Sequence, residues 1–342
     1  MKITVILCTY NRCHTLAKAL ESIAVSKVSE PAEWEVLVVD NNSNDQTREV
    51  VQDFCRRYAG RFCYLFEPRQ GKSYALNAGI REAQGDVLAF ADDDAIVAPD
   101  WLWNLTSSLY GGEWLGAGGR IIPVWETELP SWLSTEDPHT VGPLVAFDPG
   151  PGAGPLTEAP YGANMAFCRE AFEKYGGFRT DLGPRPGSEI RREDTEFGQR
   201  LLARGERLRY EPEAVVYHPV PESRVQKSFF LRWYFDYGRA MVREWECGPN
   251  ILGISRRCFT FFRFIGTYLP VAILRWMATL NPRRRFFRKC RVWTIAGQTV
   301  EIHRQWHNTR KRSNCSTQEQ SEAAPNTADS PRDFTLARRE GS

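Results

Sequence analysis

Continuous apolar runs alternate with periodic apolar stretches along residues 1–110 of the chain. The runs are rich in β-branched side chains, which is typical of strands that are covered on both faces. The stretches between them place apolar side chains on one stripe of a helix, as Leu16, Leu20 and Ile23 do. This alternation predicts a parallel sheet with right-handed crossovers. Strands are expected at 2–10, 34–42, 61–68 and 86–91, and helices at 13–24, 43–60, 72–85 and 99–110.

Two of these helices also carry boundary signals. Ser43 and Gln46 have the spacing of a capping box, and Gly60 is a residue type that commonly ends a helix. Pro99 suits the first turn of the fourth helix, where its missing N–H would have no partner in any case.

The pattern becomes less regular after residue 118. Segment 126–160 is rich in Pro and Gly and has no periodicity, and a loop this long in a compact domain is usually functional or mobile. The polar, Pro- and Ser-rich residues 313–342 are predicted to be disordered. Strands are expected at 119–125 and 207–219, an ordered segment at 161–178, and helices at 193–205 and 228–246.

Composition narrows the choice of protein class. The 342 residues are 42% hydrophobic, which is enough for a sizeable core, and 44 basic residues balance 42 acidic ones, so no nucleic-acid partner is expected. The nine cysteines are odd in number and form no CxxC pair, which favours a reducing, cytoplasmic compartment. The N-terminal apolar run is too short for the hydrophobic region of a signal peptide.

Polar residues follow three of the predicted strands, at 9–11, 40–42 and 92–94. Ligands of parallel α/β sheets bind beyond the carboxyl ends of the strands, so these residues are expected to share one site. Asp92, Asp93 and Asp94 are consecutive, and two carboxylates about 4 Å apart repel by roughly 4 kcal/mol at an effective dielectric of 20. The alternating pair Asp92 and Asp94 suits a hard divalent cation such as Mg²⁺ or Mn²⁺. A solvated turn or a helix N-cap is the simpler alternative.

Other acidic residues allow two interpretations each. Asp40 ends the second strand, where an acid can bind a nucleotide ribose or base, but no glycine follows the first strand, which excludes a dinucleotide-binding motif. The alternative for Asp40 is a helix-capping network. Glu193 and Asp194 begin a predicted helix, where acids also interact favourably with the helix dipole.

Seven motifs follow one another along the chain: VILCTYNR, VLVVDNNSND, GKSYALNAGI, GDVLAFADDDA, GANMAFCREAFEKYGGF, REDTEFGQRLLARG and VVYHP. With these motifs in this order, residues 1–225 resemble family 2 glycosyltransferases. The resemblance implies the GT-A fold, which is α/β and Rossmann-like with a mostly parallel central sheet flanked by helices. Residues 1–118 would form the nucleotide-sugar half and 119–225 the acceptor half. It also implies a nucleotide-diphosphate sugar donor, Mn²⁺ or Mg²⁺, and inversion at the anomeric carbon.

The resemblance also assigns roles by motif position. Asp194 is implied as the catalytic base, and Asp92, Asp94 and His218 as metal ligands, although a lone His before Pro is also common in surface loops. Contacts with the substrates are implied for Thr9, Tyr10, Arg12, Asp40, Lys72, Asn77, Asp92, Asp93, Asn164 and Glu193. The acceptor, a glycan or a lipid-linked sugar, is expected between the helix at 193–205 and the segment 126–160. There Trp125, Trp132 and Tyr161 either stack on a sugar or pack in the loop.

The sequence after residue 225 departs from the polysaccharide synthases of the family. Segment 226–240 lacks the Q-x-x-R-W signature, so transfer of a single hexosyl-type sugar is expected. Residues 258–280 are apolar but interrupted by Arg263, Pro270 and Arg275, which leaves an uninterrupted stretch shorter than the ~20 residues of a spanning helix. With the basic, aromatic residues 281–293 they predict a helical extension, 226–312, that lies on an anionic membrane. A soluble helical pair packed on the catalytic domain is the alternative.

Two other functions fit parts of the pattern. A sugar-1-phosphate nucleotidyltransferase also uses acids and a metal on a related sheet, but it needs a Gly-rich phosphate loop that is missing after the first strand. A glycosyltransferase-like scaffold without turnover would have lost the metal pair or the base, and this sequence retains both. An inverting glycosyltransferase is therefore the prediction.

Overall fold

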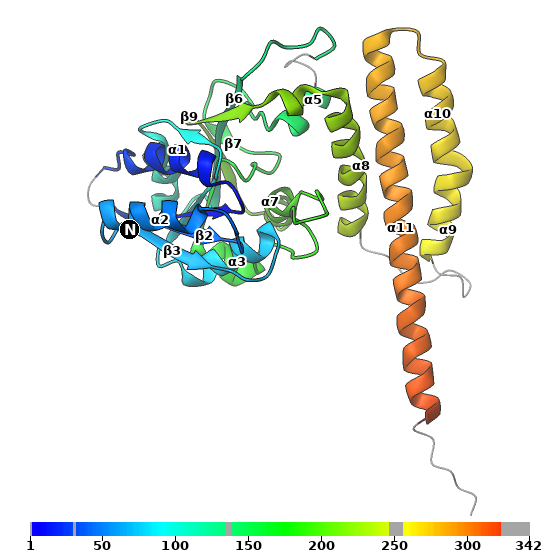
Figure 1. Cartoon of the computed structure of the whole chain (residues 1–342), viewed down its shortest axis with the longest axis horizontal. Helices are drawn as coiled ribbons and strands as arrows, with labels where there is room; N and C mark the ends of the chain where they lie inside the picture. Colours follow the sequence, from blue (N-terminus) through cyan, green and yellow to red (C-terminus); the bar gives the residue numbers. More distant parts are fainter. Residues whose placement is uncertain (1, 30–31, 134–137, 246–255, 323–342) are drawn as a thin grey trace, which may run out of the picture.

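The computed structural model describes residues 2–29, 32–133, 138–245 and 256–322, which form an α/β domain and a layer of long helices beside it (Figure 1). The α/β domain contains β1 (Lys2–Thr9), α1 (Cys13–Ala24), β2 (Glu33–Asp40), α2 (Thr47–Arg57), β3 (Phe62–Phe66), α3 (Lys72–Glu82), β4 (Val87–Asp92), β5 (Ile96–Val97), α4 (Trp101–Thr106), η1 (Ser107–Gly111), β6 (Gly116–Trp125), α5 (Pro138–Leu144), β7 (Gly154–Pro155), β8 (Met165–Cys168), α6 (Arg169–Tyr175), α7 (Glu193–Ala203), β9 (Leu208–Val220) and η2 (Glu222–Val225). The helical layer contains α8 (Lys227–Glu244), α9 (Arg256–Arg263), the π turn η3 (Phe264–Tyr268), α10 (Leu269–Met277) and α11 (Pro282–Glu322).

The first half of the sheet is parallel, as the alternating pattern predicts. Strands β3, β2, β1 and β4 lie in that order, and each pairs in parallel with its neighbours. The predicted strands and helices of residues 1–110 are all present, and their alternation therefore specified this part of the fold.

The second half of the sheet is mixed. Strand β8 pairs antiparallel with both β4 and β6, β9 pairs in parallel with β6, and the short strands β5 and β7 pair antiparallel with β9. The complete sheet is a mixed, mostly parallel central sheet flanked by helices, in agreement with the predicted GT-A class.

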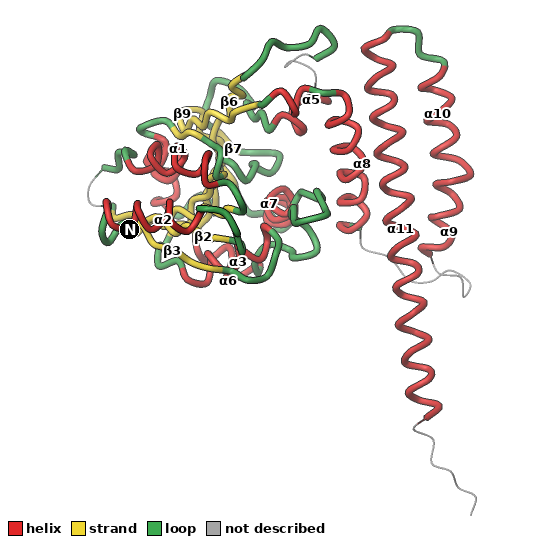
Figure 2. The backbone as a smooth tube through the Cα atoms, viewed as in Figure 1, coloured by secondary structure: helices red, strands yellow, loops and turns green. Residues whose placement is uncertain are grey.

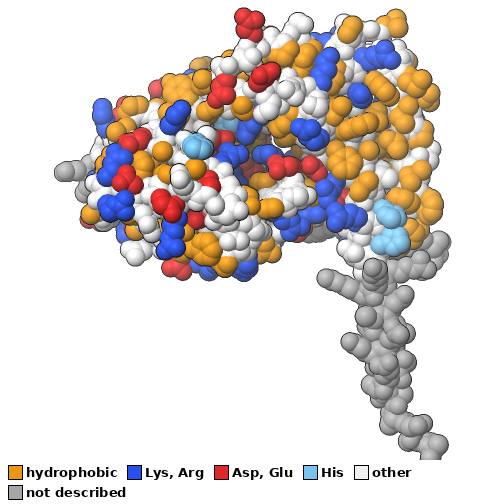
Figure 3. All heavy atoms as spheres, in the orientation of Figure 1, with side chains coloured by type: hydrophobic (Ala, Val, Ile, Leu, Met, Phe, Trp, Pro, Cys, Tyr) orange, Lys and Arg blue, Asp and Glu red, His pale blue; other side chains and the backbone are white. Residues whose placement is uncertain are grey.

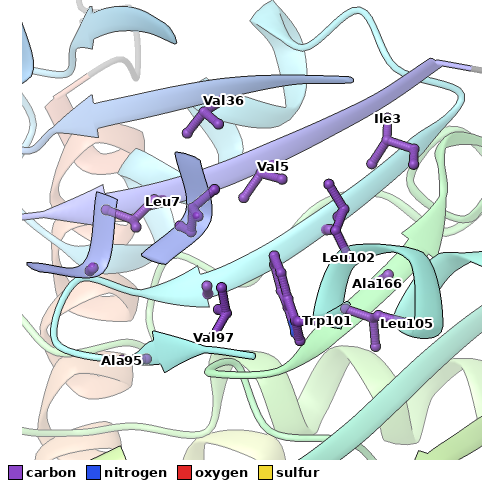
Figure 4. Packing of buried hydrophobic residues seen from close by; sticks show 14 of the residues in the cluster. Ile3, Val5, Leu7, Val36, Ala95, Val97, Trp101, Leu102, Leu105 and Ala166 are labelled. Carbon is purple, nitrogen blue, oxygen red and sulfur yellow. The ribbon is translucent and has the colours of Figure 1, made fainter. Parts of the chain in front are cut away.

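Side chains of the central strands alternate between two cores. On one face, Ile3, Val5 and Leu7 of β1 pack with side chains of α1, α2 and α4 (Figure 4). On the other face, Ile6 packs with side chains of α3, α6 and α7. Both faces of the parallel strands are therefore covered, which explains why their sequences are continuously apolar rather than alternating.

The predicted capping box at the start of α2 is wrong. The helix begins at Thr47, and Asp45 accepts hydrogen bonds from the Thr47 N–H and hydroxyl at its start. The Ser43 hydroxyl instead accepts the Asn11 N–H at 2.9 Å and links the ends of β1 and β2. Likewise, α4 begins at Trp101, two residues after Pro99.

The described part of segment 126–160 contains α5 and β7, so it is more ordered than its sequence suggests. Trp132 packs edge-on against Phe230 of α8 and Phe286 of α11, with ring centroids 5.1 and 4.7 Å apart. Trp125 contacts the same cluster. For these two tryptophans the packing alternative is therefore the one the structure supports.

Three helical segments run side by side beyond the α/β domain: α8, then α11, then the continuous helix formed by α9, η3 and α10 (Figure 2). This last helix runs from Arg256 to Met277 and is, by length and composition only, one candidate membrane span. The predicted break at Pro270 is therefore wrong: Pro270 lies at the start of α10 after a π turn, where a missing N–H is best tolerated. Helix α11 extends to Glu322, beyond residue 313 where the disordered tail was expected, and residues 323–342 lie outside the described ranges.

Candidate active site

The ends of β1, β2 and β4 meet at one edge of the sheet. Thr9 is in register with Asp40, and Cys8 is in register with Asp92. Residues that are far apart in the sequence therefore converge where the alternating pattern placed them, beyond the carboxyl ends of parallel strands.

The three consecutive aspartates are paired with cations of the chain itself. Lys72 Nζ lies 2.6 Å from Asp92 Oδ1, and Arg12 Nη1 lies 3.2 Å from Asp93 and 2.5 Å from Asp94. Burial raises the pKa of Asp93 to about 6 against the opposing effect of Arg12. Burial also opposes ionisation of Asp92, but Lys72 outweighs it and holds the pKa of Asp92 below its usual range. Asp92 therefore stays charged, whereas Asp93, the middle residue of the three, is protonated more easily than an ordinary aspartate.

Asp92, Asp94 and His218, the metal ligands that the resemblance implied, lie together in the structure. One ligand atom from each lies within 4.8 Å of the others. His218 is 1% exposed, and its Nδ1 has no hydrogen-bond partner among the residues the structure describes. Burial lowers the pKa of His218, so the imidazole is neutral and able to bind a metal. Two carboxylates and an imidazole fit Mn²⁺ or Mg²⁺, and Arg224, 3.4 Å from His218 Nε2, borders the same set.

Glu193 and Asp194 begin helix α7 on the other side of Lys72. Glu193 is 3% exposed, lies 3.8 Å from Lys72 Nζ, and has one oxygen without a partner among the described residues. Burial, together with the neighbouring Asp194, raises the pKa of Glu193 to about 7. Lys72 therefore lies between two carboxyl groups that come from opposite halves of the domain.

The carboxylate of Asp194 is held by three donors. Its Oδ2 accepts the Gly162 N–H at 2.6 Å, and its Oδ1 accepts the N–H and hydroxyl of Thr195 at 2.7 and 3.3 Å. A Cβ atom on Gly162 would lie 2.9 Å from Asp194 Oδ2, so only glycine permits this approach. The orientation of Asp194 is thus fixed by backbone groups on two segments.

A cavity of about 800 Å³ lies in front of these residues. Lys72, Asp92, Glu193 and Asp194 form one wall, and Tyr161 with residues 141–149 forms another. The third wall belongs to the helical layer and contains Phe229, Trp233, Tyr237, Phe287, Arg291 and Thr294. The cavity therefore opens between α7 and the Pro/Gly-rich segment, where the acceptor was expected.

The structure does not bring every predicted substrate contact to this cavity. Asn164 is 0% exposed. Its side-chain oxygen accepts a hydrogen bond from the Trp101 indole, and its side-chain nitrogen donates to the carbonyls of Arg120 and Ala214. Asn77 forms two hydrogen bonds with the backbone of Phe178. Both amides are occupied in holding strands and loops together, which is a structural role.

Residues predicted to contact the nucleoside lie around the ends of β1 and β2. Tyr10 is 37% exposed, whereas Thr9 and Asp40 are each 2% exposed. Asp40 accepts hydrogen bonds from the Ser43 N–H and the Tyr64 hydroxyl, at 2.9 and 2.8 Å. It therefore shapes the loop after β2.

Sequence reasoning missed three parts of the site. Arg224 follows β9 and lies 3.8 Å from Asp94; a cation six residues after His218 was the available signal. Arg192 precedes the two acids of α7, adopts a left-handed φ of 85°, and is bound to Glu244 of α8 at 2.6 Å. The aromatic wall from α8 and α11 had no signal, because only the packing of the helical layer brings it to the cavity.

Comparison with known proteins gives consistent results. Residues 4–176 match the model of the family described as glycosyl transferase family 2. Over 241 residues the chain is 30% identical to the succinoglycan biosynthesis protein ExoM of Rhizobium meliloti, covering 69% of this chain and 73% of that protein. Over 237 residues it is 29% identical to a glucosyl-dolichyl phosphate glucuronosyltransferase of Haloferax volcanii, covering 68% and 73%.

Solved structures show the same fold. A mannosyltransferase, PcManGT from Pyrobaculum calidifontis, in complex with GDP-Man and Mn²⁺, superposes with a TM-score of 0.57 and 21% identity over 88% of this chain and 86% of that one. GalNAc-T7 with UDP, GalNAc and Mn²⁺ superposes with a TM-score of 0.52 and 16% identity over 71% of this chain and 51% of that one. At these identities the likeness concerns the fold alone.

Proposed function

This chain belongs to glycosyl transferase family 2 and is a glycosyltransferase, and we propose that it transfers a single sugar from a nucleotide-diphosphate sugar to an acceptor hydroxyl with inversion. One observation carries the proposal. Asp92, Asp94 and His218 lie together, and Asp92 lines the same cavity as the oriented carboxylate of Asp194. The proposed metal ligands, which would stabilise the leaving group, and the proposed base, Asp194, therefore lie at the same cavity.

The donor diphosphate is assigned to the side of the cavity formed by β1, β4 and the end of β9. Asp92, Asp94 and His218 would hold Mn²⁺ or Mg²⁺ there, and such an ion stabilises the charge that builds on a leaving diphosphate. Lys72, Arg12 and Arg224 now pair with the aspartates, and a bound diphosphate gives these cations a second anionic partner. The proposal is consistent with two structures of the same fold, which contain GDP-Man or UDP with Mn²⁺.

Asp194 is proposed as the general base. Its three hydrogen bonds fix the carboxylate, and a carboxylate offers about four acceptor positions, so one remains for the acceptor hydroxyl. Proton removal by a positioned base typically contributes about 10²–10⁴ in rate. Attack on the face opposite the leaving group needs only this one base and inverts the anomeric carbon.

The acceptor is proposed to lie between Asp194 and the aromatic wall of the helical layer. Tyr161 lines the cavity beside Asp194, and Trp233 and Tyr237 stack with ring centroids 5.0 Å apart in that wall. Such surfaces bind the apolar faces of sugars. A glycan or a lipid-linked sugar fits this position. The name of the Haloferax relative, a glucosyl-dolichyl phosphate glucuronosyltransferase, contains a lipid-linked sugar.

Thermal stabilisation by nucleoside diphosphates tests the donor assignment. We expect one of UDP, GDP or dTDP to stabilise the protein in the presence of Mn²⁺, by about 2.7 kcal/mol at a hundredfold excess over Kd, and CMP, a monophosphate, to have little effect. Asp92→Asn and Asp94→Asn should remove the metal-dependent part, whereas Asp53→Asn, an exposed acid on α2, should not. Stabilisation that is identical in all variants and independent of metal would refute the proposed site.

The stereochemical part needs a separate measurement. Proton NMR of the first product formed from an α-linked donor should show a β linkage. Appearance of the α anomer in that product contradicts inversion while leaving the family and donor class in place.

A further inference from the structure

The outward surface of the helix α9–η3–α10 is mostly apolar, with Arg263 and Arg275 as exposed cations on it. Figure 3 shows hydrophobic side chains covering the side of the helical layer that is remote from the α/β domain. Only 6% of the most apolar 18-residue window of this helix is buried. The exposed large apolar side chains are Phe259 (59%), Phe262 (61%), Ile265 (44%), Tyr268 (37%), Val271 (41%), Leu274 (65%), Met277 (61%) and, just beyond the helix, Leu280 (93%). We call this set the outer face.

The inner side of the same helix is already packed. Phe264 and Ala272 are buried against Val292 and Ile295 of α11. The outer face is therefore not the core side of an amphipathic helix. The exposed side of this helix therefore carries a second set of large apolar side chains, and their contact with water is unfavourable.

The segment that bears the outer face is also strongly cationic. Between residues 256 and 300 the sequence contains ten Lys and Arg residues and no Asp or Glu. Among them, Arg263 and Arg275 lie on the exposed side of the apolar helix itself, and Arg284, Arg285 and Arg288 are exposed at the start of α11. Apolar side chains with flanking cations match an anionic lipid surface, in which each cation near the headgroups adds about 1 kcal/mol of attraction.

Crossing of the bilayer by this helix is disfavoured by its neighbour. Helix α11 packs against α9, η3 and α10, so it would have to enter the bilayer with them. Between Pro282 and Glu301 it carries Arg283, Arg284, Arg285, Arg288, Lys289, Arg291, Gln298 and Glu301. Charged side chains at such density are not found in lipid-facing helices. The helix is long enough to span, but its setting in the fold favours a position parallel to the surface.

We propose that the outer face of α9–η3–α10 docks in the plane of an anionic lipid bilayer, with its apolar side chains at the boundary between headgroups and acyl chains. The cations of α9, α10 and the start of α11 contact the headgroups. The α/β domain stays in water on the other side of α11.

This docking places the active-site cavity next to the membrane. Helix α11 has one side, with Phe287, Arg291 and Thr294, in the wall of the cavity, and packs with another side on α10. Packed helix axes are typically about 8–10 Å apart, so the cavity wall lies within one or two helix diameters of the bilayer. Resting on the function proposed above, this geometry favours an acceptor embedded in that bilayer over a soluble glycan.

Vesicle binding by the full chain tests the proposal without any donor or acceptor. The protein should sediment with vesicles of phosphatidylglycerol and phosphatidylcholine, and less with phosphatidylcholine alone or at high salt. The double variant Phe262→Glu, Leu274→Glu changes two side chains that are more than half exposed, so folding is expected to persist. We expect its partition into anionic vesicles to fall at least about tenfold. Val25→Glu, which adds a charge at a 60% exposed position on the α/β domain, is the matched control and should bind as the parent does.

Three outcomes would overturn the docking model. Unchanged partition of the double variant would show that the outer face does not touch lipid. Retention of the chain in membranes after alkaline carbonate extraction would show that it crosses them. A dimer that the double variant converts to a monomer, with vesicle binding unaltered, would assign the outer face to a second copy. Metal-dependent stabilisation by a nucleoside diphosphate should be the same in parent and variant, so failure here is distinct from failure of the proposed function.

Discussion

Two clusters of acids and cations occur in this molecule, and they differ in how completely their charges are paired. In the active-site cluster around the ends of β1 and β4, ion pairs among the described residues join the four carboxylates of Asp92, Asp93, Asp94 and Glu193 to the three cations of Arg12, Lys72 and Arg224. Between α8 and α11, Glu301 binds Arg243 at 2.8 Å and Arg239 at 3.2 Å, and Arg239 also binds Asp236 at 3.0 Å. The second cluster holds two acids and two cations.

We infer from this difference that the charges between α8 and α11 stabilise the fold, whereas those of the active site bind a ligand. In the active-site cluster, burial raises the pKa of Asp93 to about 6 and that of Glu193 to about 7, so the fold disfavours their charged forms. In the cluster between α8 and α11, the two oxygens of Glu301 each have an arginine partner. Unbalanced carboxylates are typical of sites that gain a cation or substrate, and they reduce stability in exchange for function.

The largest expected effect is on catalysis, from a carboxylate of the cavity. Asp194→Asn keeps the size and most hydrogen bonds of the side chain but cannot accept a proton, so kcat should fall about 10²–10⁴-fold. Stabilisation by the nucleoside diphosphate should not change. Glu196→Gln is the control, because Glu196 lies on the same helix and pairs with Arg200 at 2.9 Å. Transfer by Asp194→Asn within about tenfold of the parent rate would exclude this residue as the base.

The next effect is on stability, from the balanced cluster. Glu301 is 4% exposed, and Glu301→Gln leaves Arg243 without its carboxylate and Arg239 with Asp236 alone, which should destabilise the protein by about 3 kcal/mol. Urea unfolding and hydrogen exchange in α11 measure this loss. Glu113→Gln removes the exposed pair with Arg207 and should cost about 0.5 kcal/mol or less. Equal effects of the two variants would show that the α8–α11 cluster is no more important than a surface pair.

Glu193→Gln, unlike Glu301→Gln, should increase the stability of the protein at high pH. The folded-state pKa of Glu193, about 7, is above the ordinary 4.5, so the folded protein binds the extra proton between these values and loses stability as pH rises from about 4.5 to about 7. In chelator-treated protein, Glu193→Gln should remove this decline and be more stable than the parent at pH 8 by about 2 kcal/mol. Urea unfolding at pH 5 and pH 8 provides the comparison. A variant that is less stable than the parent at pH 8 would mean that the Lys72 pair outweighs the burial of Glu193.

Features that depend on local sequence could be predicted, whereas features that depend on long-range pairing could not. The parallel strands, their order in the chain and the convergence of Thr9, Asp40 and Asp92 follow from local periodicity and from where strands end. Asn77 and Asn164 lie in family motifs, but their motif positions do not reveal that backbone groups occupy their amides. Glu301, Glu244 and Arg192 carry no local signal, because their partners lie more than 50 residues away in the chain. Long-range pairing of this kind is visible only in the folded structure.

Arg192 joins the two regions compared above. It lies directly before Glu193 and Asp194, in a left-handed conformation that side chains other than glycine rarely adopt. Two contacts with α8 hold it: both oxygens of Glu244, at 2.6 and 2.9 Å, and the ring of Tyr237, 5.2 Å from the guanidinium carbon. The helical layer therefore helps to set where the first turn of α7, and with it Asp194, is placed.

Removing the ion pair between Arg192 and Glu244 should give the smallest of the four effects, and that effect should be confined to the chemical step. Glu244→Gln is expected to lower kcat about tenfold, or 1.4 kcal/mol, while KM for the donor stays within about twofold, because the donor contacts lie on other strands. Arg192→Gly should give a similar loss, and the double variant should be no worse than either single one, since both remove the same interaction. Glu189→Gln is the control, because it breaks the exposed pair with the adjacent Arg191. If the losses add instead, or if KM for the donor rises with kcat unchanged, Arg192 and Glu244 act separately, and the helical layer does not position the catalytic base.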